Sequence, residues 1–479
     1  MKKKSYERRA KIICTLGPSS NSYSSIIALA NAGMNVARLN FSHGTHEQHA
    51  EKIDILRKVS FDIGRPIGIL LDLQGPKIRV QKFKDGEVFL KGGQEFVLTT
   101  RDVVGDDTIV SVSYPDFHND VEPGEQVLLD DGNLRMTVDE ISGQDVHCIV
   151  DYGGRLKDHK GLNLPGSVLS VDALTDKDKD DLEFGLKKGV DFVALSFVQQ
   201  PEDIIMIKDI ISGAGHSTPV IAKIEKPQAV ERIKEIAEVT DMIMIARGDL
   251  GVEMATEEVP PIQKRIIRIC NDLGVPVITA TQMLESMIDH PRPTRAEAAD
   301  VANAILDGSD AVMLSGETAA GKYPVDAAET MSRIVTLIES DTLDKFGLHR
   351  RKPDWEYPTP VAIGYSACNT AQMVKAKAII CLTQSGSTAL MIARFRPETP
   401  IHVVTPRIDT YFRTALIWGV KVHHTEDMFP DHMDDAIHHV FIMLKDRKVV
   451  KKGDKVVITA GIPFDKVGCT NMLRIEEVW

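Results

Sequence analysis

The chain has 479 residues, of which 43% are hydrophobic and 26% are charged, and its formal net charge is −12. This composition is that of an ordinary globular protein with about two to four domains. The acidic balance argues against nucleic acid and anionic membranes as partners, because both are bound by basic surfaces.

The six cysteines are scattered along the chain without a C-x-x-C pair. That usage indicates a reduced, cytoplasmic protein and argues against a disulfide framework or a structural zinc site. The basic segment 1–17 is not followed by a long apolar core, so no signal peptide is expected. No apolar run reaches the ~18 residues expected of a membrane-spanning helix.

Short apolar, β-branched runs alternate with helix-like stretches over the first two thirds of the chain. These runs lie at 11–18, 34–42, 66–74, 190–198, 220–225, 241–250, 275–282 and 310–318. Near-continuous apolar strands that alternate with helices indicate a parallel sheet covered on both faces. The eight units predict a (β/α)₈ TIM barrel, which we assign to residues 1–75 and 165–345.

A segment of different character interrupts the barrel after its third strand. Between residues 76 and 164 the sequence reads as short alternating strands with Gly and Asp turns, as in GEVFLKGGQEFVLTT. This pattern predicts a small antiparallel β-barrel domain. Because the insertion follows a strand, it lies in a loop at the catalytic face of the barrel, and we expect it to act as a lid.

A stretch at 349–360 with charges and prolines predicts a further boundary. The remaining sequence, which we assign as a domain over 346–479, alternates apolar runs with helices and predicts an open-sheet α/β unit. Its segment LTQSGSTALMIARFRP combines a strand, a Ser/Thr/Gly turn and a helix start, a pattern typical of anion pockets. Ordinary helix capping by the same hydroxyl groups is the alternative.

In a (β/α)₈ barrel the chemistry takes place where the strands end. The predicted strand ends carry polar or charged side chains that would meet at one mouth. These are Arg38, Asn40, Ser42, Asp72, Lys223, Glu225, Arg247, Asp249, Thr279, Thr281, Gln282, Ser315 and Glu317. An internal ion pair would explain one charged pair, whereas charges at several strand ends favour a common site.

Lys223 and Glu225 are two residues apart and therefore face the same side of a strand. Asp249 ends the neighbouring strand, and carboxylates beside substrate oxygens and waters are the usual way to hold Mg²⁺. A lysine fixed beside them suits a phosphoryl group in transit, whose transition state requires positive charge. Together the residues predict transfer from a small phosphorylated acid, with Mg²⁺ or Mn²⁺ as the cofactor.

Several long motifs resemble those of the pyruvate kinase family. They are MNVARLNFSHGTHEQHA, DLQGPKIR, AKIEKPQAV, MIARGDLGVE, ITATQMLESM and PRPTRAEAADVANAILDGSDAVMLSGETAAGKYP. The resemblance covers essentially the whole chain. It implies the glycolytic reaction of phosphoenolpyruvate with ADP to give pyruvate and ATP, and the homotetramer that is usual in the family.

Two other functions are weighed against this one. The first is a catalytically silent paralogue that only binds effectors, and the second is another (β/α)₈ enzyme of phosphoenolpyruvate or pyruvate, such as a lyase. The complete set of charged residues disfavours the first. The inserted lid with its candidate nucleotide-binding cations disfavours the second.

The resemblance also implies roles for individual residues. Arg38 looks like the arginine near the substrate phosphate, and Lys223 like the lysine that stabilises the transferring phosphoryl group. Thr281 resembles the threonine near the enolate carbon, where a proton must be delivered. The backbone amides of Gly248 and Asp249 would hold the substrate carboxylate. Positions that resemble nucleotide contacts are Asn40, His43, Arg79 and Lys160.

The first residues of the inserted domain depart from the pattern of family members that need K⁺. In those members the ion is held by the equivalents of Asn40, Ser42 and Asp72, and glutamate stands at the position of Lys77. This chain resembles the K⁺-independent branch. A lysine ammonium is a compact point charge on a flexible stem, so we predict that Lys77 replaces K⁺ and that K⁺ is not required. A solvated surface lysine is the alternative.

The turn in the C-terminal unit resembles the sugar-phosphate effector loop of the family. The candidate effector-binding residues are Thr383, Ser385, Gly386, Ser387 and Thr388. The opposing loop 461–471 offers Lys466 as its cation. These residues do not distinguish a sugar phosphate from AMP as the allosteric effector.

Three histidines recur at steps of three residues, at positions 43, 46 and 49. No cysteine accompanies them, so we do not expect zinc. We predict instead that His46 and His49 lie on a solvated helix face.

Overall fold

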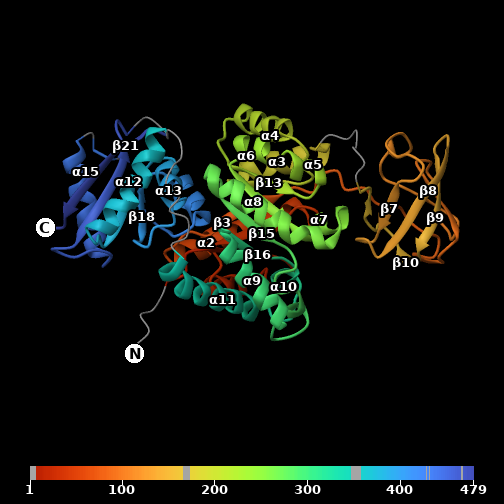
Figure 1. Ribbon diagram of the computed structural model, residues 1–479, viewed down its shortest axis with the longest axis horizontal. Coiled ribbons are helices and arrows are strands. Elements are labelled where there is room, and N and C mark those ends of the chain that lie inside the picture. Colours follow the sequence, from red (N-terminus) through yellow and green to blue (C-terminus); the bar gives the residue numbers. More distant parts are fainter. Residues whose placement is uncertain (1–6, 166–172, 347–357, 428, 431, 465–467) are drawn as a thin grey trace.

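The computed structural model describes residues 7–165, 173–346, 358–427, 429–430, 432–464 and 468–479. Three units follow one another along the longest axis of the molecule (Figure 1). The barrel lies in the middle, the inserted β domain lies at one end and the C-terminal domain lies at the other.

Eight parallel strands close into a barrel in the order β1-β16-β15-β14-β13-β12-β3-β2. Their bounds are Lys11–Thr15 (β1), Val36–Asn40 (β2), Gly68–Asp72 (β3), Phe192–Leu195 (β12), Val220–Ile224 (β13), Met242–Ala246 (β14), Val277–Ala280 (β15) and Ala311–Leu314 (β16). Each strand lies inside one of the predicted apolar runs, so the predicted barrel is confirmed. Most of its strand residues are buried, because helices cover the outside and side chains fill the inside.

Helices surround this barrel. Their bounds are Tyr23–Ala32 (α1), His46–Asp62 (α2), Asp176–Lys188 (α3), Pro201–Gly213 (α4), Pro227–Glu231 (α5), Ile233–Val239 (α6), Arg247–Glu253 (α7), Val259–Leu273 (α8), Arg295–Asp307 (α9), Gly316–Ala319 (α10) and Pro324–Phe346 (α11), with 3₁₀ turns at Thr256–Glu258 (η2) and Glu285–Ile288 (η3). Thr45, Thr175 and Thr294 start α2, α3 and α9 with reciprocal capping bonds to the residue three positions later.

The predicted solvated face of α2 is wrong for His49. The His49 side chain is buried and stacks on Phe41, with ring centroids 4.0 Å apart. His46 is partly exposed, but its Nε2 lies 2.7 Å from Asp181 Oδ1 and its ring stacks on Phe184. Both partners belong to α3, which follows the inserted domain. The spacing of the histidines describes α2 alone. It could not show that α3, which is more than a hundred residues later in the chain, packs on α2.

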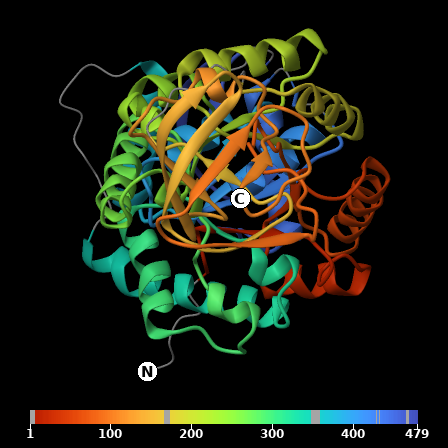
Figure 2. The ribbon, with the colours of Figure 1, turned by 90° about the vertical axis from the view of Figure 1, so that its right-hand side faces the viewer.

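The inserted domain lies between β3 and α3. Its strands are Glu87–Leu90 (β4), Glu95–Thr99 (β5), Ile109–Ser111 (β6), Gln126–Leu129 (β7), Leu134–Ser142 (β8), Asp145–Tyr152 (β9), Gly154–Lys157 (β10) and Leu162–Asn163 (β11), with a 3₁₀ turn at Phe117–Asn119 (η1). They form a six-stranded sheet, β11-β7-β8-β9-β5-β6, and a β10-β4 ribbon around a separate apolar core. Seen from the side of this domain, its strands lie in front of the ring of barrel helices (Figure 2).

The strand pairs of the inserted domain are antiparallel as predicted, with one departure. β5 and β6 pair in parallel, so the segment between them has to return to the end of the sheet at which β5 began. The prediction of a small β domain in a barrel loop is confirmed. We call this domain the lid from here on.

The C-terminal domain is an open sheet with the strand order β19-β18-β17-β20-β21. Its elements are Thr359–Met373 (α12), Ala378–Leu382 (β17), Ser387–Ala393 (α13), Ile401–Thr405 (β18), Ile408–Arg413 (α14), Thr414–Leu416 (η4), Val420–His424 (β19), Met433–Asp446 (α15), Lys455–Gly461 (β20) and Thr470–Glu477 (β21). Four strands are parallel and β21 is an antiparallel edge. The predicted open α/β sheet is confirmed, while the domain limits stay predictions because most of 349–360 lies outside the described residues.

The C-terminal domain closes the end of the barrel that is opposite the lid. Ala415 and Leu416 of η4 pack into one apolar cluster with barrel residues such as Leu70 and Phe192. Side chains from the two domains also form a buried ion pair, Arg396 Nη2 to Asp310 Oδ1 at 2.8 Å. The carboxyl ends of the strands are therefore the accessible end of the barrel.

Within the described part of the chain, none of the helices combines the length and the apolar character that crossing a membrane requires.

Candidate active site

A row of alternating charges crosses the mouth of the barrel at the ends of β2, β3 and β13. Arg38 Nε lies 2.5 Å from Asp72 Oδ2. Lys223 Nζ lies 3.3 Å from Asp72 Oδ1 and 2.8 Å from Glu225 Oε1. The four side chains are between 1% and 13% exposed. Charges buried to this degree need a partner of opposite sign, so each member of the row holds the next in position.

Strand order explains how these residues meet. β12 lies between β3 and β13 in the barrel, so the Lys223 side chain reaches across β12 to Asp72. Ser196, directly after β12, fills the space between them. The Lys223 ammonium donates a hydrogen bond to Ser196 Oγ at 2.7 Å, and the Ser196 hydroxyl donates to the carbonyl oxygen of Leu73 at 2.7 Å.

Ser196 was missed by the sequence analysis. It stands at the carboxyl end of its strand, as the predicted site residues do on theirs. Its position at the strand end was therefore the one feature of the sequence that could have identified it. The run VDFVALSFV carries no ionisable residue at this end, so nothing in its chemistry pointed to a site.

The pKa values of the row follow from burial and from neighbouring charges. Burial alone would raise the pKa of Asp72, but Lys223 and Arg38 outweigh burial and leave that pKa below its ordinary value. Burial would lower the pKa of Lys223, but Asp72, Glu225 and Asp249 raise it above its ordinary value. Lys223 is therefore a fixed positive charge at neutral pH and not a general base.

Thr281 and α7 form the other side of the mouth. The Thr281 hydroxyl accepts a hydrogen bond from the Gly248 N–H at 2.7 Å and donates one to the carbonyl oxygen of Ala280 at 2.6 Å. Thr281 has a φ of 66°, a left-handed conformation that is costly for a β-branched residue. Arg247 supports it by donating to the Thr281 carbonyl at 2.7 Å while pairing with Asp300.

The two acidic residues at β13 and β14 fit a divalent cation. Glu225 Oε2 accepts a hydrogen bond from the Phe197 N–H at 2.8 Å. Burial raises the pKa of Glu225, Lys223 opposes that shift and the nearby Asp249 adds to it. The Asp249 carboxylate is half-buried and has no hydrogen bond or ion pair with any other described residue. A cation between these two carboxylates would relieve their repulsion, and oxygen donors are the ligands that Mg²⁺ prefers.

Comparison with known proteins identifies the family. The family model for the barrel domain of pyruvate kinase matches residues 7–328, and the model for its alpha/beta domain matches residues 361–476. The chain belongs to the pyruvate kinase family.

Individual pyruvate kinases are similar to this chain over nearly all of its length. The chain is 46% identical to pyruvate kinase 2 of Synechocystis sp. over 98% of this chain and 79% of that relative. It is 44% identical to the pyruvate kinase of Clostridium perfringens over 98% of this chain and 100% of that relative. A crystal structure of a pyruvate kinase from Cryptosporidium parvum matches with a TM-score of 0.90 and 38% identity, covering 98% of this chain and 96% of that one. The activity of the chain is therefore pyruvate kinase activity.

Of the candidate nucleotide-binding residues of this pyruvate kinase, Asn40 lies beside the charged row, opposite Asp72, and the other three lie elsewhere. His43 is exposed after β2, and Arg79 and Lys160 belong to the lid. Arg79 donates to the carbonyl oxygen of His159 at 2.9 Å, and Lys160 Nζ lies 2.6 Å from Asp130 Oδ1. In the described structure the Arg79 and Lys160 side chains therefore pair within the lid and not with the row.

The residues of the predicted K⁺ pocket are only partly assembled. Asn40 Oδ1 accepts a hydrogen bond from the Ser42 N–H at 3.1 Å, and Asn40 lies opposite Asp72 in the β2–β3 pairing. Lys77 lies at the start of the lid and close to Gly161 near its end, where a Cβ at position 161 would be 3.2 Å from Lys77 Cε. Its ammonium has no hydrogen bond or ion pair with any other residue that the structure describes, Asp72 included.

The candidate effector residues lie in the C-terminal domain, at the end of the molecule away from the lid (Figure 1). Gly386, with a φ of 85°, precedes α13 and donates its N–H to Thr383 Oγ1 at 3.0 Å. The Thr388 and Thr470 hydroxyl oxygens are 2.7 Å apart, and a narrow cavity of about 20 Å³ separates this turn from the loop that begins at Gly461. Lys466 lies outside the described residues.

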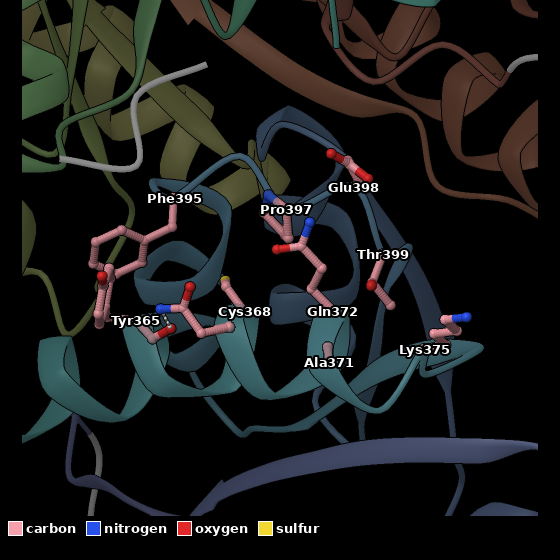
Figure 3. Close-up of a pocket in the computed structure, with 10 residues that line it drawn as sticks. Tyr365, Cys368, Ala371, Gln372, Lys375, Phe395, Pro397, Glu398 and Thr399 are labelled. Atoms are coloured by element: carbon pink, nitrogen blue, oxygen red, sulfur yellow. Dashed lines mark hydrogen bonds between the residues drawn. The ribbon is translucent and has the colours of Figure 1, made fainter. Parts of the chain in front are cut away.

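A larger cavity of about 310 Å³ lies on the same domain, between α12 and residues 395–399 (Figure 3). None of the candidate site residues lines it. The Tyr365 and Phe395 rings meet edge to face at one end of this cavity.

Ser196 offers a test of how the row works. Replacing it, Ser196→Ala, removes one hydrogen-bond acceptor of the Lys223 ammonium. We expect kcat to fall about tenfold, the equivalent of one charge-assisted hydrogen bond, as measured by steady-state pyruvate formation.

The matched control is Ser60→Ala, because Ser60 is also buried and its hydroxyl also bridges two backbone groups, Arg65 O and Ile67 N. Both variants should lose a similar ~1–2 kcal/mol of stability, but only Ser196→Ala should lose rate. An unchanged kcat in Ser196→Ala would contradict the role assigned to this hydroxyl.

Proposed function

We propose that the chain transfers the phosphoryl group of phosphoenolpyruvate to ADP at the mouth of its barrel, and that Lys223 and Arg38 stabilise that group in transit. The observation that supports this most directly is the Lys223 ammonium, buried and held by Asp72, Glu225 and Ser196. Charge spreads over the phosphoryl oxygens in the transition state. A cation that is already in position stabilises that charge with little reorganisation.

Asp72 supplies the counter-charge for both cations. It pairs with Arg38 and Lys223 at once, so neither cation is buried alone before the substrate binds. The substrate phosphate would then share these cations with Asp72 without having to bring them together. This arrangement stabilises the transition state with groups that are already oriented.

Thr281 is the residue that we assign to the proton. Loss of the phosphoryl group leaves the enolate of pyruvate, whose terminal carbon must gain a proton. The Thr281 hydroxyl is oriented by the Gly248 N–H and the Ala280 carbonyl oxygen, and it would hold the proton for that carbon. We assign the substrate carboxylate to the Gly248 and Asp249 amides. The Gly248 N–H donates to Thr281 in this structure, so it would have to share its hydrogen with the carboxylate, which places the carboxylate next to the Thr281 hydroxyl.

We assign Mg²⁺, or Mn²⁺ in its place, to Glu225 and Asp249. When bound, the ion neutralises negative charge on the substrates and aligns their oxygens. The chain itself contributes two carboxylates, of which Glu225 is held in position by the Phe197 N–H and Lys223.

The nucleotide is assigned to Asn40, His43, Arg79 and Lys160. Arg79 and Lys160 are lid residues, so closure of the lid would bring them to ADP. The Lys160–Asp130 pair is partly exposed, with Lys160 41% accessible. Exposed pairs of this kind contribute little stability, and Lys160 can therefore exchange Asp130 for a phosphate at small cost.

The decisive variant is Lys223→Met, which removes the charge and keeps the stem. We expect kcat to fall by at least about 10³-fold while the folded structure is retained by circular dichroism. The matched control is Lys322→Met, because Lys322 forms an exposed pair with Asp289 and is not part of the charged row. A Lys223→Met variant that keeps most of its rate would refute the assignment, and pyruvate release from the parent without ADP would favour a lyase.

We also propose that Lys77 takes the place of K⁺ beside Asn40, Ser42 and Asp72. Its ammonium is uncommitted among the described residues, and it stands where the chain leaves β3 for the lid. The flexible stem would allow it to reach the anionic substrates once they are bound.

The Lys77 proposal predicts activity without K⁺. With K⁺ exchanged for a bulky organic cation, the parent should keep its rate within about twofold, whereas Lys77→Glu should become K⁺-dependent. Lys82→Glu, at an exposed position of the same domain, should behave as the parent does. Collapse of the parent activity without K⁺ would show that Lys77 does not replace the ion.

We further propose a cytoplasmic homotetramer regulated by a phosphorylated effector, a sugar phosphate or AMP, bound at residues 383–388. The turn presents hydroxyl groups and backbone N–H groups next to a cavity, which suits a phosphate.

A panel of sugar phosphates and AMP tests the effector proposal. One ligand should lower the half-saturating phosphoenolpyruvate concentration about three- to tenfold, a typical coupling for an allosteric pair. The double variant Ser385→Ala/Ser387→Ala should lose that response and keep the basal rate, whereas Ser340→Ala on α11 should keep both. If no ligand of the panel shifts the saturation curve, the effector site is assigned wrongly.

A further inference from the structure

A buried carboxylate lies behind the candidate active site, at the last residue of α7. The Glu253 side chain is 1% exposed, and its Oε1 lies 2.8 Å from the ammonium of Lys226, which is itself 5% exposed. Its second oxygen, Oε2, is buried without a hydrogen-bond partner in the described structure. None of the roles described above uses this ion pair.

The same carboxylate oxygen is reached from the lid. Asn163, the last residue of β11, donates its side-chain N–H to Glu253 Oε1 at 2.8 Å. Asn163 is part of the lid sheet, because β11 pairs with β7 through Leu162↔Leu129 and Asn163↔Leu128. α7 lies at the end of the barrel that faces the lid (Figure 1). One oxygen atom thus joins the lid to the barrel.

The two barrel residues of this junction each adjoin a candidate metal ligand. Lys226 follows Glu225 directly, and Glu253 closes the short helix whose first turn carries Asp249. Phe197 adds a link, because its N–H donates to Glu225 Oε2 and its ring centroid is 5.9 Å from the Lys226 ammonium. A shift of Glu253 would therefore move both segments that position the carboxylates.

The energetics make the junction sensitive to the lid. A buried carboxylate is costly unless its oxygens accept hydrogen bonds. Among the described residues Glu253 has two donors, one from the barrel and one from the lid, and no third to compensate for the loss of either. Removing the Asn163 donor leaves the Lys226 ammonium as its one remaining partner among the described residues. The orientation of the lid and the position of Glu253 are therefore energetically coupled.

We propose that Glu253 is a positioning residue that aligns the lid, through Asn163, with the segments carrying Glu225 and Asp249. Contact with the lid then places the metal ligands, and bound metal in turn favours that orientation of the lid. The inference rests on the assignment of Mg²⁺ to these two carboxylates. It extends that assignment to three residues that touch neither substrate nor metal.

The first test uses Asn163→Ala, which removes the lid donor and leaves the buried ion pair intact. We expect the dissociation constant of the free enzyme for Mn²⁺, measured by electron paramagnetic resonance, to rise about fivefold. KM for ADP should rise by a similar factor of about five, with kcat within about twofold. Asn119→Ala, which removes a different side-chain amide bond within the lid, Asn119 to Asp116, should change neither quantity.

The second test reverses the hydrogen bond. Asn163→Asp alone sets two carboxylates against each other and should weaken Mn²⁺ binding by more than about twentyfold. Combining it with Glu253→Gln lets the new amide donate to the new carboxylate and keeps a negative charge near Lys226. The double variant should recover Mn²⁺ binding to within about twofold of the parent.

Two results would overturn the proposal. One is a changed KM for ADP in Asn163→Ala with unchanged Mn²⁺ binding, because the junction would then anchor only the lid. The other is a double variant whose loss equals the sum of the single losses in free energy, because the two side chains would then act independently. Failure of the underlying metal assignment is distinguishable from both, since Glu225→Gln would then leave Mn²⁺ binding unchanged.

Discussion

The candidate site depends on one buried carboxylate, that of Asp72, placed between two cations. Arg38 and Lys223 come from β2 and β13, on either side of β3, and each pairs with a different oxygen of Asp72. Without this negative charge the two cations would repel each other in a region where water cannot screen them. The same pairing keeps Lys223 charged in spite of its burial. A phosphate that enters the mouth therefore meets positive charge that is already oriented.

The rest of the fold places this charged row between an apolar barrel interior and the substrate-accessible mouth. The C-terminal domain fills the opposite end of the barrel with Leu416, and side chains fill the interior between that end and the mouth. The charges lie in the outermost layer, above this apolar filling, where substrates have access and the local dielectric constant is low. The lid stands beyond that layer and contacts α7 of the barrel through Asn163 and Glu253.

The lid and the C-terminal domain are joined to the barrel by different contacts. At the lid end, Asn163 and Glu253 meet on one carboxylate oxygen. At the other end, Arg396 and Asp310 form a buried pair where β16 begins. Both are junctions between domains in which a charge is removed from water, and such charges tolerate little displacement of their partners.

The amino-acid sequence by itself determined the strands, the barrel, the position of the insertion and the identity of the charged residues at the mouth. Apolar runs of strand length are local features, and in a parallel barrel every such run ends at the same mouth, so Arg38, Asp72, Lys223 and Glu225 could be grouped before any contact was known. The family motifs carried the remaining assignments, since spacing alone does not distinguish Thr281 from its neighbours.

Only the tertiary structure decided which side chains share a partner. Ser196 and Glu253 contact lysines 27 positions away on other segments, and Asn163 meets Glu253 across 90 positions. His49 is buried against Phe41, and His46 meets Asp181 on α3, which returns to pack on α2 after the whole lid has intervened. Periodicity reports which face of an element is apolar, whereas these pairings depend on how elements distant in the chain are brought together, and that is set by the packing of the complete fold.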